Sequence, residues 1–368
     1  MKSPRTIALL LTFCALAATA CNSGTSQPVT RTESTTSQIQ PASLVSNPST
    51  NSGDVATTES PAEPTMLPGP NAVPKDTRIV VNIPAFRMDV FKDGVLVKSF
   101  KVGIGYPEYP LPRGLRKAET IIFNPTWTPP NEPWVANPGV VVPAGSKANP
   151  LGPIKVPIGA PSLIHGGKAL SKIGTFASHG CVGMTNEQVK DFAKVLADAS
   201  GTELSTDTMS SWLKRPGRTQ VLKLAQIVPV ELRYETIVVE EGKLRIYRDV
   251  YGQKTNTEES LRAVLDAHGI SFDGMSEPEK SQVLEILNIV SRNPKKQPTP
   301  APTVAVNQTV EEKRAAAAAR KAEAERVRKL RSQREFEVVI AAVSGKGYPA
   351  AMNLNDGKPS VATASAAR

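Results

Sequence analysis

The chain has 368 residues, with 44 Lys and Arg against 34 Asp and Glu and a formal net charge of +10 at pH 7. Such a charge favours anionic partners such as cell wall, acidic lipid headgroups or nucleic acid, although part of it lies at the two ends of the chain. Of the three cysteines, Cys14 and Cys21 lie at the extreme N-terminus. We expect Cys14 to be removed with an export signal and Cys21 to be lipidated, which leaves Cys181 without a disulfide partner.

The N-terminus has the pattern of an export signal. Lys2 and Arg5 precede an apolar run, 7–18, that is too short to cross a bilayer. Cys21 follows Ala-Thr-Ala and resembles the lipidated cysteine of a bacterial lipobox, so we expect residues 1–20 to be a signal peptide and Cys21 to carry a lipid. Ordinary cleavage without a lipid stays open, because alanine stands where leucine is usual. The expected location is the periplasmic face of a membrane, the outer one in a diderm.

Export also argues against nucleic acid as a partner. A membrane, contacted through the N-terminal lipid, is an expected partner. Residues 21–76 are rich in Ser, Thr, Pro, Asn and Gln without apolar periodicity, which predicts a disordered tether.

Strand patterns begin at Thr77. The runs 78–83 and 87–91 are β-branched and aromatic, and Asp93-Gly94 predicts the type I′ turn of a hairpin. Frequent Pro and Gly between 103 and 161 indicate loops and short strands. A second hairpin around residues 240–242 is expected to close the sheet. The predicted fold class is therefore mainly β with few helices.

One helix is predicted inside this region, directly after Cys181. Thr185 is its expected N-cap, Gln188 completes a capping box, and Met184 is positioned to pack against Val189. The positive end of this helix, together with a nearby imidazole, is expected to lower the pKa of the Cys181 thiol.

Two of the three histidines lie close to that cysteine, in Ile164-His165-Gly166 and Ser178-His179-Gly180-Cys181. A thiol beside histidine and glycine suits a nucleophile with its base, and the bare backbone of Gly180 offers amides of Gly180 and Cys181 to an oxyanion. Acyl transfer is the chemistry indicated. A buried inert cysteine stays an alternative, whereas the spacing matches no common zinc pattern and the order Cys after His differs from papain-like proteases.

These motifs resemble the YkuD-type L,D-transpeptidases, whose signature joins Ile-His-Gly to Ser-His-Gly-Cys. Segments 124–127, 149–152, 229–234 and 249–252 are also similar to such domains, so the resemblance covers about residues 77–254. It implies a β-sandwich or barrel-like catalytic domain that needs no metal or organic cofactor. The roles implied are Cys181 as nucleophile, His165 as general base, Ser178, His179, Gly180 and Gly166 as shaping the site and its oxyanion hole, and Trp127, Asn149 and Gly152 as substrate-binding candidates.

The implied reaction acts on peptidoglycan stem peptides. Cys181 attacks the third residue of a tetrapeptide stem and releases D-alanine, and the acyl group passes to another stem as a 3-3 cross-link, to a lysine of a wall-anchored protein, or to water in a hydrolase. Family members usually carry Arg or Asn two residues after the cysteine, where this chain has Gly183. That departure keeps open a non-catalytic wall-binding lipoprotein, and Lys168, Lys172 or Arg113 could supply a replacement cation.

Beyond residue 254 the resemblance ends and patterning alone guides the prediction. The predicted parts are a helical appendage at 255–295, a Pro-rich linker at 296–310, a charged Ala-rich helix at 311–340 and a disordered tail at 341–368.

Overall fold

The computed structural model describes residues 67–291 and 309–357. The predicted signal peptide, Cys21, the tether up to residue 66, the linker from 296 to 308 and residues 358–368 lie outside the described residues. Within the described ranges the protein is mainly β with a few helices, which confirms the predicted fold class. No helix there is long and apolar enough to cross a membrane.

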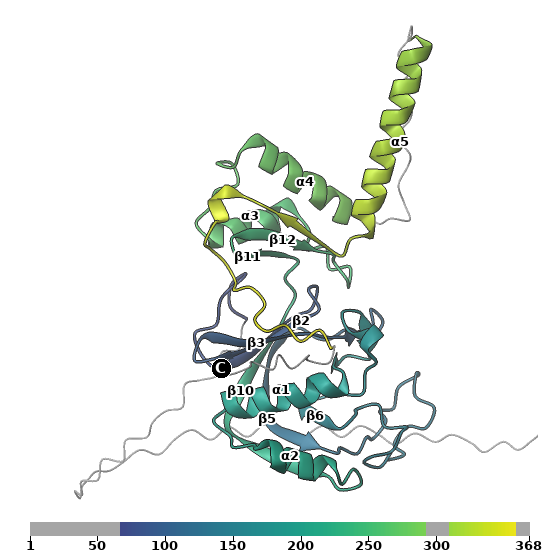
Figure 1. Ribbon diagram of the computed structural model, residues 1–368, viewed down its shortest axis with the longest axis vertical. Helices are drawn as coiled ribbons and strands as arrows, with labels where there is room; N and C mark the ends of the chain where they lie inside the picture. Colours follow the sequence, from purple (N-terminus) through teal and green to yellow (C-terminus); the bar gives the residue numbers. More distant parts are fainter. Residues whose placement is uncertain (1–66, 292–308, 358–368) are drawn as a thin grey trace, which may run out of the picture. The chain divides into compact units, whose positions relative to one another are not determined.

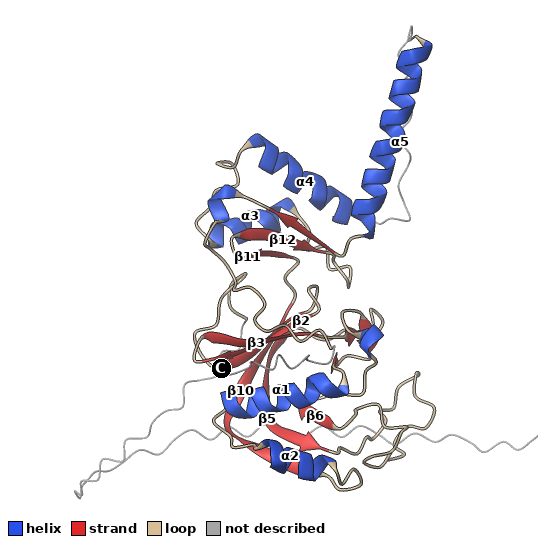
Figure 2. Ribbon diagram, in the orientation of Figure 1, coloured by secondary structure: helices blue, strands red, loops and turns tan. Residues whose placement is uncertain are grey.

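The larger sheet has eight strands in the order β3-β2-β1-β10-β5-β6-β7-β9. Figures 1 and 2 show this sheet with β2, β3, β5, β6 and β10 labelled. Its strands are β1 (Arg78–Asn82), β2 (Arg87–Lys92), β3 (Val95–Lys101), β5 (Gly114–Phe123), β6 (Ile154–Pro157), β7 (Leu163–His165), β9 (Val182–Gly183) and β10 (Gln220–Arg233). Two further short strands, β4 (Ile104–Gly105) and β8 (Phe176–Ser178), pair in parallel with each other. The edge formed by β7 and β9 carries the segments that the sequence singled out.

The first predicted hairpin is confirmed. Strands β2 and β3 are antiparallel, and Asp93 and Gly94 adopt φ of 51° and 78°, the positive values that a type I′ turn requires at both central positions. Strand β1 then pairs in parallel with β10, where Ile79 lies opposite Val230. The two partners are separated by 150 residues of the sequence. The hairpin therefore forms locally, while its place in the sheet depends on a distant strand.

The helix predicted after the cysteine is also confirmed. Helix α1 (Asn186–Ala199) begins at the N-cap Thr185, whose side chain accepts from the Gln188 backbone while the Gln188 side chain accepts from the Thr185 backbone. Its apolar stripe, including Phe192 and Leu196, is buried in the main core. Helix α2 (Thr206–Leu213) follows, and Figure 1 shows both helices beside the sheet. Packing of α1 fixes where the chain emerges from β9.

The second hairpin does not close the main sheet, so that prediction is wrong. Strands β11 (Ile237–Glu240) and β12 (Lys243–Tyr247) form a separate three-stranded sheet with β13 (Glu335–Val338). Helices α3 (Glu258–Ala267) and α4 (Glu277–Ser291) pack on this sheet around a second hydrophobic core. The predicted helical appendage is thus present, as two helices, but these cover a sheet that includes the hairpin assigned to the catalytic region.

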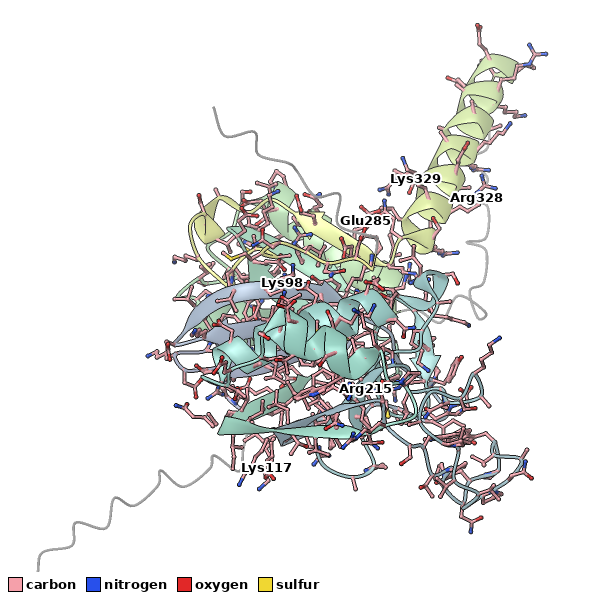
Figure 3. The ribbon with its side chains drawn as sticks, turned by 60° about the horizontal axis from the view of Figure 1, so that its bottom comes forward. Lys98, Lys117, Arg215, Glu285, Arg328 and Lys329 are labelled. Carbon is pink, nitrogen blue, oxygen red and sulfur yellow. The ribbon has the colours of Figure 1, made fainter. Side chains whose placement is uncertain are left out.

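The charged helix is shorter than predicted. Helix α5 runs over Val310–Ser332, is capped by Thr309 and Glu312, and buries none of its side chains. An ion pair between Arg326 and Glu285 joins it to α4, and Figure 3 labels Glu285 together with Arg328 and Lys329 of α5. The residues after 332 form β13 instead of continuing the helix, because Phe336 and Val338 alternate inward on a strand.

Residues 341–357 are ordered, contrary to the prediction of a disordered tail. A short 3₁₀ turn, Ala341–Val343, is followed by the buried Tyr348, whose hydroxyl donates to Asp89 of β2. Further on, Asn355 exchanges backbone hydrogen bonds with β3, and its carbonyl accepts from the Gln188 side chain. The buried side chains of Val343 and Tyr348, together with polar side chains and backbone amides, hold this segment.

Candidate active site

The register of β7 and β9 places Cys181 and His165 on one side of the sheet edge. These strands are parallel, with Ile164 opposite Val182 and His165 opposite Gly183. Ile164 and Val182 are fully buried in the core. Because side chains alternate along a strand, His165 on β7 and Gly183 on β9 lie on the other side of the sheet. Cys181, which directly precedes β9, shares that side.

His165 is 3% exposed, and its Nδ1 lies 2.8 Å from the carbonyl oxygen of Gly166. Because a carbonyl only accepts, this hydrogen bond requires the proton on Nδ1 and leaves Nε2 as the basic nitrogen of the neutral ring. Burial first, and the positive charge of Lys168 after it, lower the pKa of His165 to about 3, against hydrogen bonds to the backbone of Gly166 and Leu151 that raise it. The imidazole is therefore neutral and able to take up a proton.

Cys181 is half-buried and is a free thiol. Burial raises the pKa of the thiol, while a hydrogen bond with the backbone of Leu163 and the positive charge of Lys168 lower it. Burial is the largest of these effects, so the pKa of the thiol is raised, contrary to the expected lowering. Among the described residues no hydrogen bond joins Sγ to the His165 ring, a common state of sites without substrate.

Ser178 and Gly180 fix the loop that carries the cysteine. The Ser178 hydroxyl donates to the Cys181 carbonyl at 2.5 Å and accepts from the Cys181 amide at 3.1 Å. Gly180 has φ of 85°, a left-handed conformation that favours glycine, and its carbonyl accepts from the buried Ser162 hydroxyl at 2.9 Å. Of the two amides expected to serve an oxyanion, that of Cys181 is therefore engaged by Ser178 in this state.

His179 points into an aromatic cluster. Its ring stacks on Trp134 with centroids 3.8 Å apart and planes 9° apart, and it lies 4.9 Å from the ring of Tyr109 and 5.3 Å from that of Tyr106. Burial and the charge of Lys168 lower the pKa of His179. This residue holds the loop that contains Trp134, a contact that the sequence did not indicate because it joins segments 45 residues apart, from 134 to 179.

The three substrate-binding candidates make structural contacts. Trp127 exchanges two backbone hydrogen bonds with Val142, which closes the loop between them. Asn149 donates to the Pro125 carbonyl and accepts from the Leu151 amide, so both ends of its amide group are used. Gly152 has φ of 66° and lies close to the backbone of Gly167. A Cβ on Gly152 would lie 2.3 Å from the backbone nitrogen of Gly167. Trp134 is the tryptophan that contacts the loop before Cys181, through its stacking on His179.

The cations considered beside Gly183 differ in position. The Lys168 side chain lies against Gly183, where a Cβ would be 2.8 Å from the Lys168 Cγ. Arg113 instead donates to Gln253, and Lys172 lies exposed in the 3₁₀ turn Leu170–Lys172. In the described part of the chain, no group of three or more His, Cys, Asp or Glu side chains could hold a metal ion.

A half-buried thiol, a buried neutral imidazole and a glycine turn before the thiol are groups of the kind that cysteine acyl-transfer chemistry uses. Residues 76–221 match the L,D-transpeptidase catalytic domain family, YkuD, and form a domain of that family. The matched range contains Cys181, His165 and the loop around them, and it ends within β10.

A curated relative is the probable L,D-transpeptidase ErfK/SrfK of Escherichia coli strain K12, with 36% identity over 138 residues. The aligned part is 34% of this chain and 43% of the relative, so the chain spans less than half the length of the curated relative that it matches.

Solved structures that are similar include the catalytic domain of an Enterococcus faecium L,D-transpeptidase, with 17% identity, a TM-score of 0.30, and coverage of 44% of this chain and 100% of that one. Another is an L,D-transpeptidase from Mycobacterium tuberculosis H37Rv, with 17% identity, a TM-score of 0.26, and coverage of 43% and 57%. At these scores the family assignment of the domain rests on the sequence comparisons.

Proposed function

We propose that the domain at residues 76–221 is a peptidoglycan L,D-transpeptidase that works through an acyl-enzyme on Cys181. The observation that carries the proposal is the His165–Gly166 hydrogen bond, which leaves Nε2 basic on the side of the sheet edge where Cys181 lies. The family of the domain supports peptide stems of the wall as the substrate class.

In the first step, His165 Nε2 takes the proton from the Cys181 thiol, and the sulfur attacks the carbonyl carbon of the third residue of a tetrapeptide stem. The resulting oxyanion is held by backbone amides of the cysteine loop, the Gly180 amide being free of a protein partner among the described residues. When the C–N bond breaks, the imidazolium returns its proton to the leaving amine, and D-alanine departs from a thioester.

In the second step an acceptor amine attacks the thioester carbonyl and gives its proton to His165, and the Cys181 sulfur leaves and regains that proton. The side-chain amine of another stem yields a 3-3 cross-link. A lysine of a surface protein yields a wall-anchored protein, and water yields hydrolysis to a tripeptide.

The test is to incubate the purified chain from residue 22 onward with a disaccharide tetrapeptide and to follow intact mass and products. The expected result is loss of D-alanine with a dimeric product, absent in Cys181→Ala and reduced at least about hundredfold in His165→Gln. His268→Gln is the matched histidine control and should retain activity. Tripeptide alone would point to the hydrolase, and neither adduct nor product would favour the non-catalytic wall-binding protein.

We also propose that the protein is exported and held at a membrane by a lipid on Cys21. In a bacterial host, Cys21→Ala should move the protein from the membrane fraction to the soluble fraction, since one lipidated terminus is the only proposed tether. Unchanged membrane partition of the variant would contradict the lipid anchor.

A further inference from the structure

The side chain of Lys168 lies in the space that Gly183 leaves open. A Cβ at Gly183 would stand 2.8 Å from Cγ, 3.1 Å from Cε and 3.4 Å from Cδ of Lys168, so the whole stem covers this glycine. The Lys168 amide donates to the Met184 carbonyl at 3.0 Å, which ties its backbone to the end of β9. Any larger residue at position 183 must displace this side chain.

Lys168 has no carboxylate partner in the described part of the chain. No hydrogen bond or ion pair involves its ammonium there, although the residue is only partly exposed. Burial lowers the pKa of Lys168, and the negative charge of a Cys181 thiolate raises it. Among the described residues, the Cys181 thiolate is thus the anion whose charge acts on this cation.

The other titratable groups around the thiol do not supply a positive charge. His165 from β7 is neutral, since burial and Lys168 lower its pKa to about 3, and the pKa of His179 is lowered by burial and Lys168 as well. Lys172 acts on Lys168, lowering its pKa, and Tyr109 contributes only an aromatic contact to His179. Among these groups, Lys168 is the one whose charge favours the thiolate.

We propose that Lys168 is the positioning residue that stabilises the Cys181 thiolate, and that Gly183 is required because it makes room for the lysine side chain. The proposal rests on Cys181 being the reactive thiol of the proposed function. The positive charge of the site then belongs to a lysine that approaches from the segment after β7, while His165 remains the neutral base.

The test is the pH dependence of alkylation of Cys181 by iodoacetamide, the only free thiol of the chain from residue 22 onward. In Lys168→Met, loss of the cation should raise the midpoint of the alkylation profile by about one pH unit and slow the reaction at pH 7 about tenfold. Lys172→Met is the matched control and should not raise the midpoint, since its ammonium acts on Lys168 instead of on the thiol. An unchanged midpoint in Lys168→Met would overturn the proposal.

Gly183→Ala tests the second part of the proposal, that Gly183 makes room for the Lys168 side chain. Gly183 is not in the left-handed region, so alanine meets no backbone strain, but its Cβ must push the Lys168 stem aside. We expect Gly183→Ala to raise the midpoint in the presence of Lys168 and to have no further effect in Lys168→Met, because no charge is left to displace. Equal shifts in both backgrounds would refute a role through Lys168.

The alkylation readout needs no wall substrate, so it separates the two proposals. A shifted profile in Lys168→Met without product from tetrapeptide would leave the lysine inference standing and contradict the transpeptidase. Turnover of the tetrapeptide by the wild type, together with an unshifted alkylation profile in Lys168→Met, would support the transpeptidase and overturn the lysine inference. A thermal unfolding midpoint for each variant shows that the folded protein is being compared.

Discussion

Ser178 determines the conformation of the cysteine loop through two hydrogen bonds to one neighbour, the amide and the carbonyl of Cys181. We expect Ser178→Ala to slow D-alanine release about ten- to a hundredfold, because small displacements of a nucleophile are costly and the freed backbone groups must find other partners. Ser171→Ala, at an exposed position of the neighbouring 3₁₀ turn, serves as control and should retain the wild-type rate. Equal rates for both variants would remove Ser178 from the machinery.

His165 makes stability depend on pH. Its folded pKa, about 3, lies below its unfolded value of about 6.5. The unfolded chain therefore binds a proton first as the pH falls, so the contribution of the neutral ring is complete above about pH 6.5 and is lost between about 6.5 and 3.

As the pH falls through this window, we therefore expect the free energy of unfolding of the wild type to decrease relative to that of His165→Gln. The expected decrease is about 1.4 kcal/mol for each unit of pH. Urea unfolding of both proteins at several pH values measures the difference. A constant difference from pH 7 to pH 4 would show that the ring is not held neutral.

At the scale of elements, two helices carry the same capping box but bury different amounts of surface. Helix α1 buries one side in the main core, whereas α5 buries none of its residues. Thr185→Ala should lower the free energy of unfolding by about 1 kcal/mol, since the cap of a packed helix contributes to the cooperative core.

Thr309→Ala, the matched change on α5, should alter the main unfolding transition by less than about 0.5 kcal/mol. Chemical denaturation followed by circular dichroism compares the two variants. A larger loss from Thr309→Ala than from Thr185→Ala would mean that α5 takes part in the core.

Elements with local determinants were predictable from sequence. The turn at Asp93-Gly94 and the cap at Thr185 involve residues within three or four positions, and both formed as expected. The hairpin of β11 and β12 was assigned to the wrong sheet, because its third strand, β13, begins about 90 residues later. Strand β13 itself is four residues long and follows a helix-forming run, so its pattern was absorbed into the predicted helix.

At the scale of the whole molecule, the segment from Tyr348 to Gly357 links the C-terminal part to the first strands and to α1. Arg87 donates to the Pro349 carbonyl, the Ser99 amide donates to Met352, and Asn355 bonds to β3 and to the side chains of Gln188 and Asp191. These contacts are polar and lie far apart in sequence.

A chain ended after residue 348 should therefore lose several hydrogen bonds, each contributing about 1 kcal/mol, and its thermal midpoint should fall by at least about 5 °C. A chain ended after residue 357 removes none of the described contacts and serves as control. Identical midpoints for the two truncated chains would show that the segment does not stabilise the fold.

The sequence by itself determined the chemistry of the candidate site and the local elements that present it. Glycine, serine and histidine around a lone thiol, and a capping box four residues after it, are properties of short segments. Only the tertiary structure decided that His165 is buried and neutral, that His179 stacks on Trp134, and that Lys168 fills the space beside Gly183. The physical reason is that burial, ring stacking and charge proximity depend on which distant segments the sheet brings together, and strand pairing over long separations is not encoded in local periodicity.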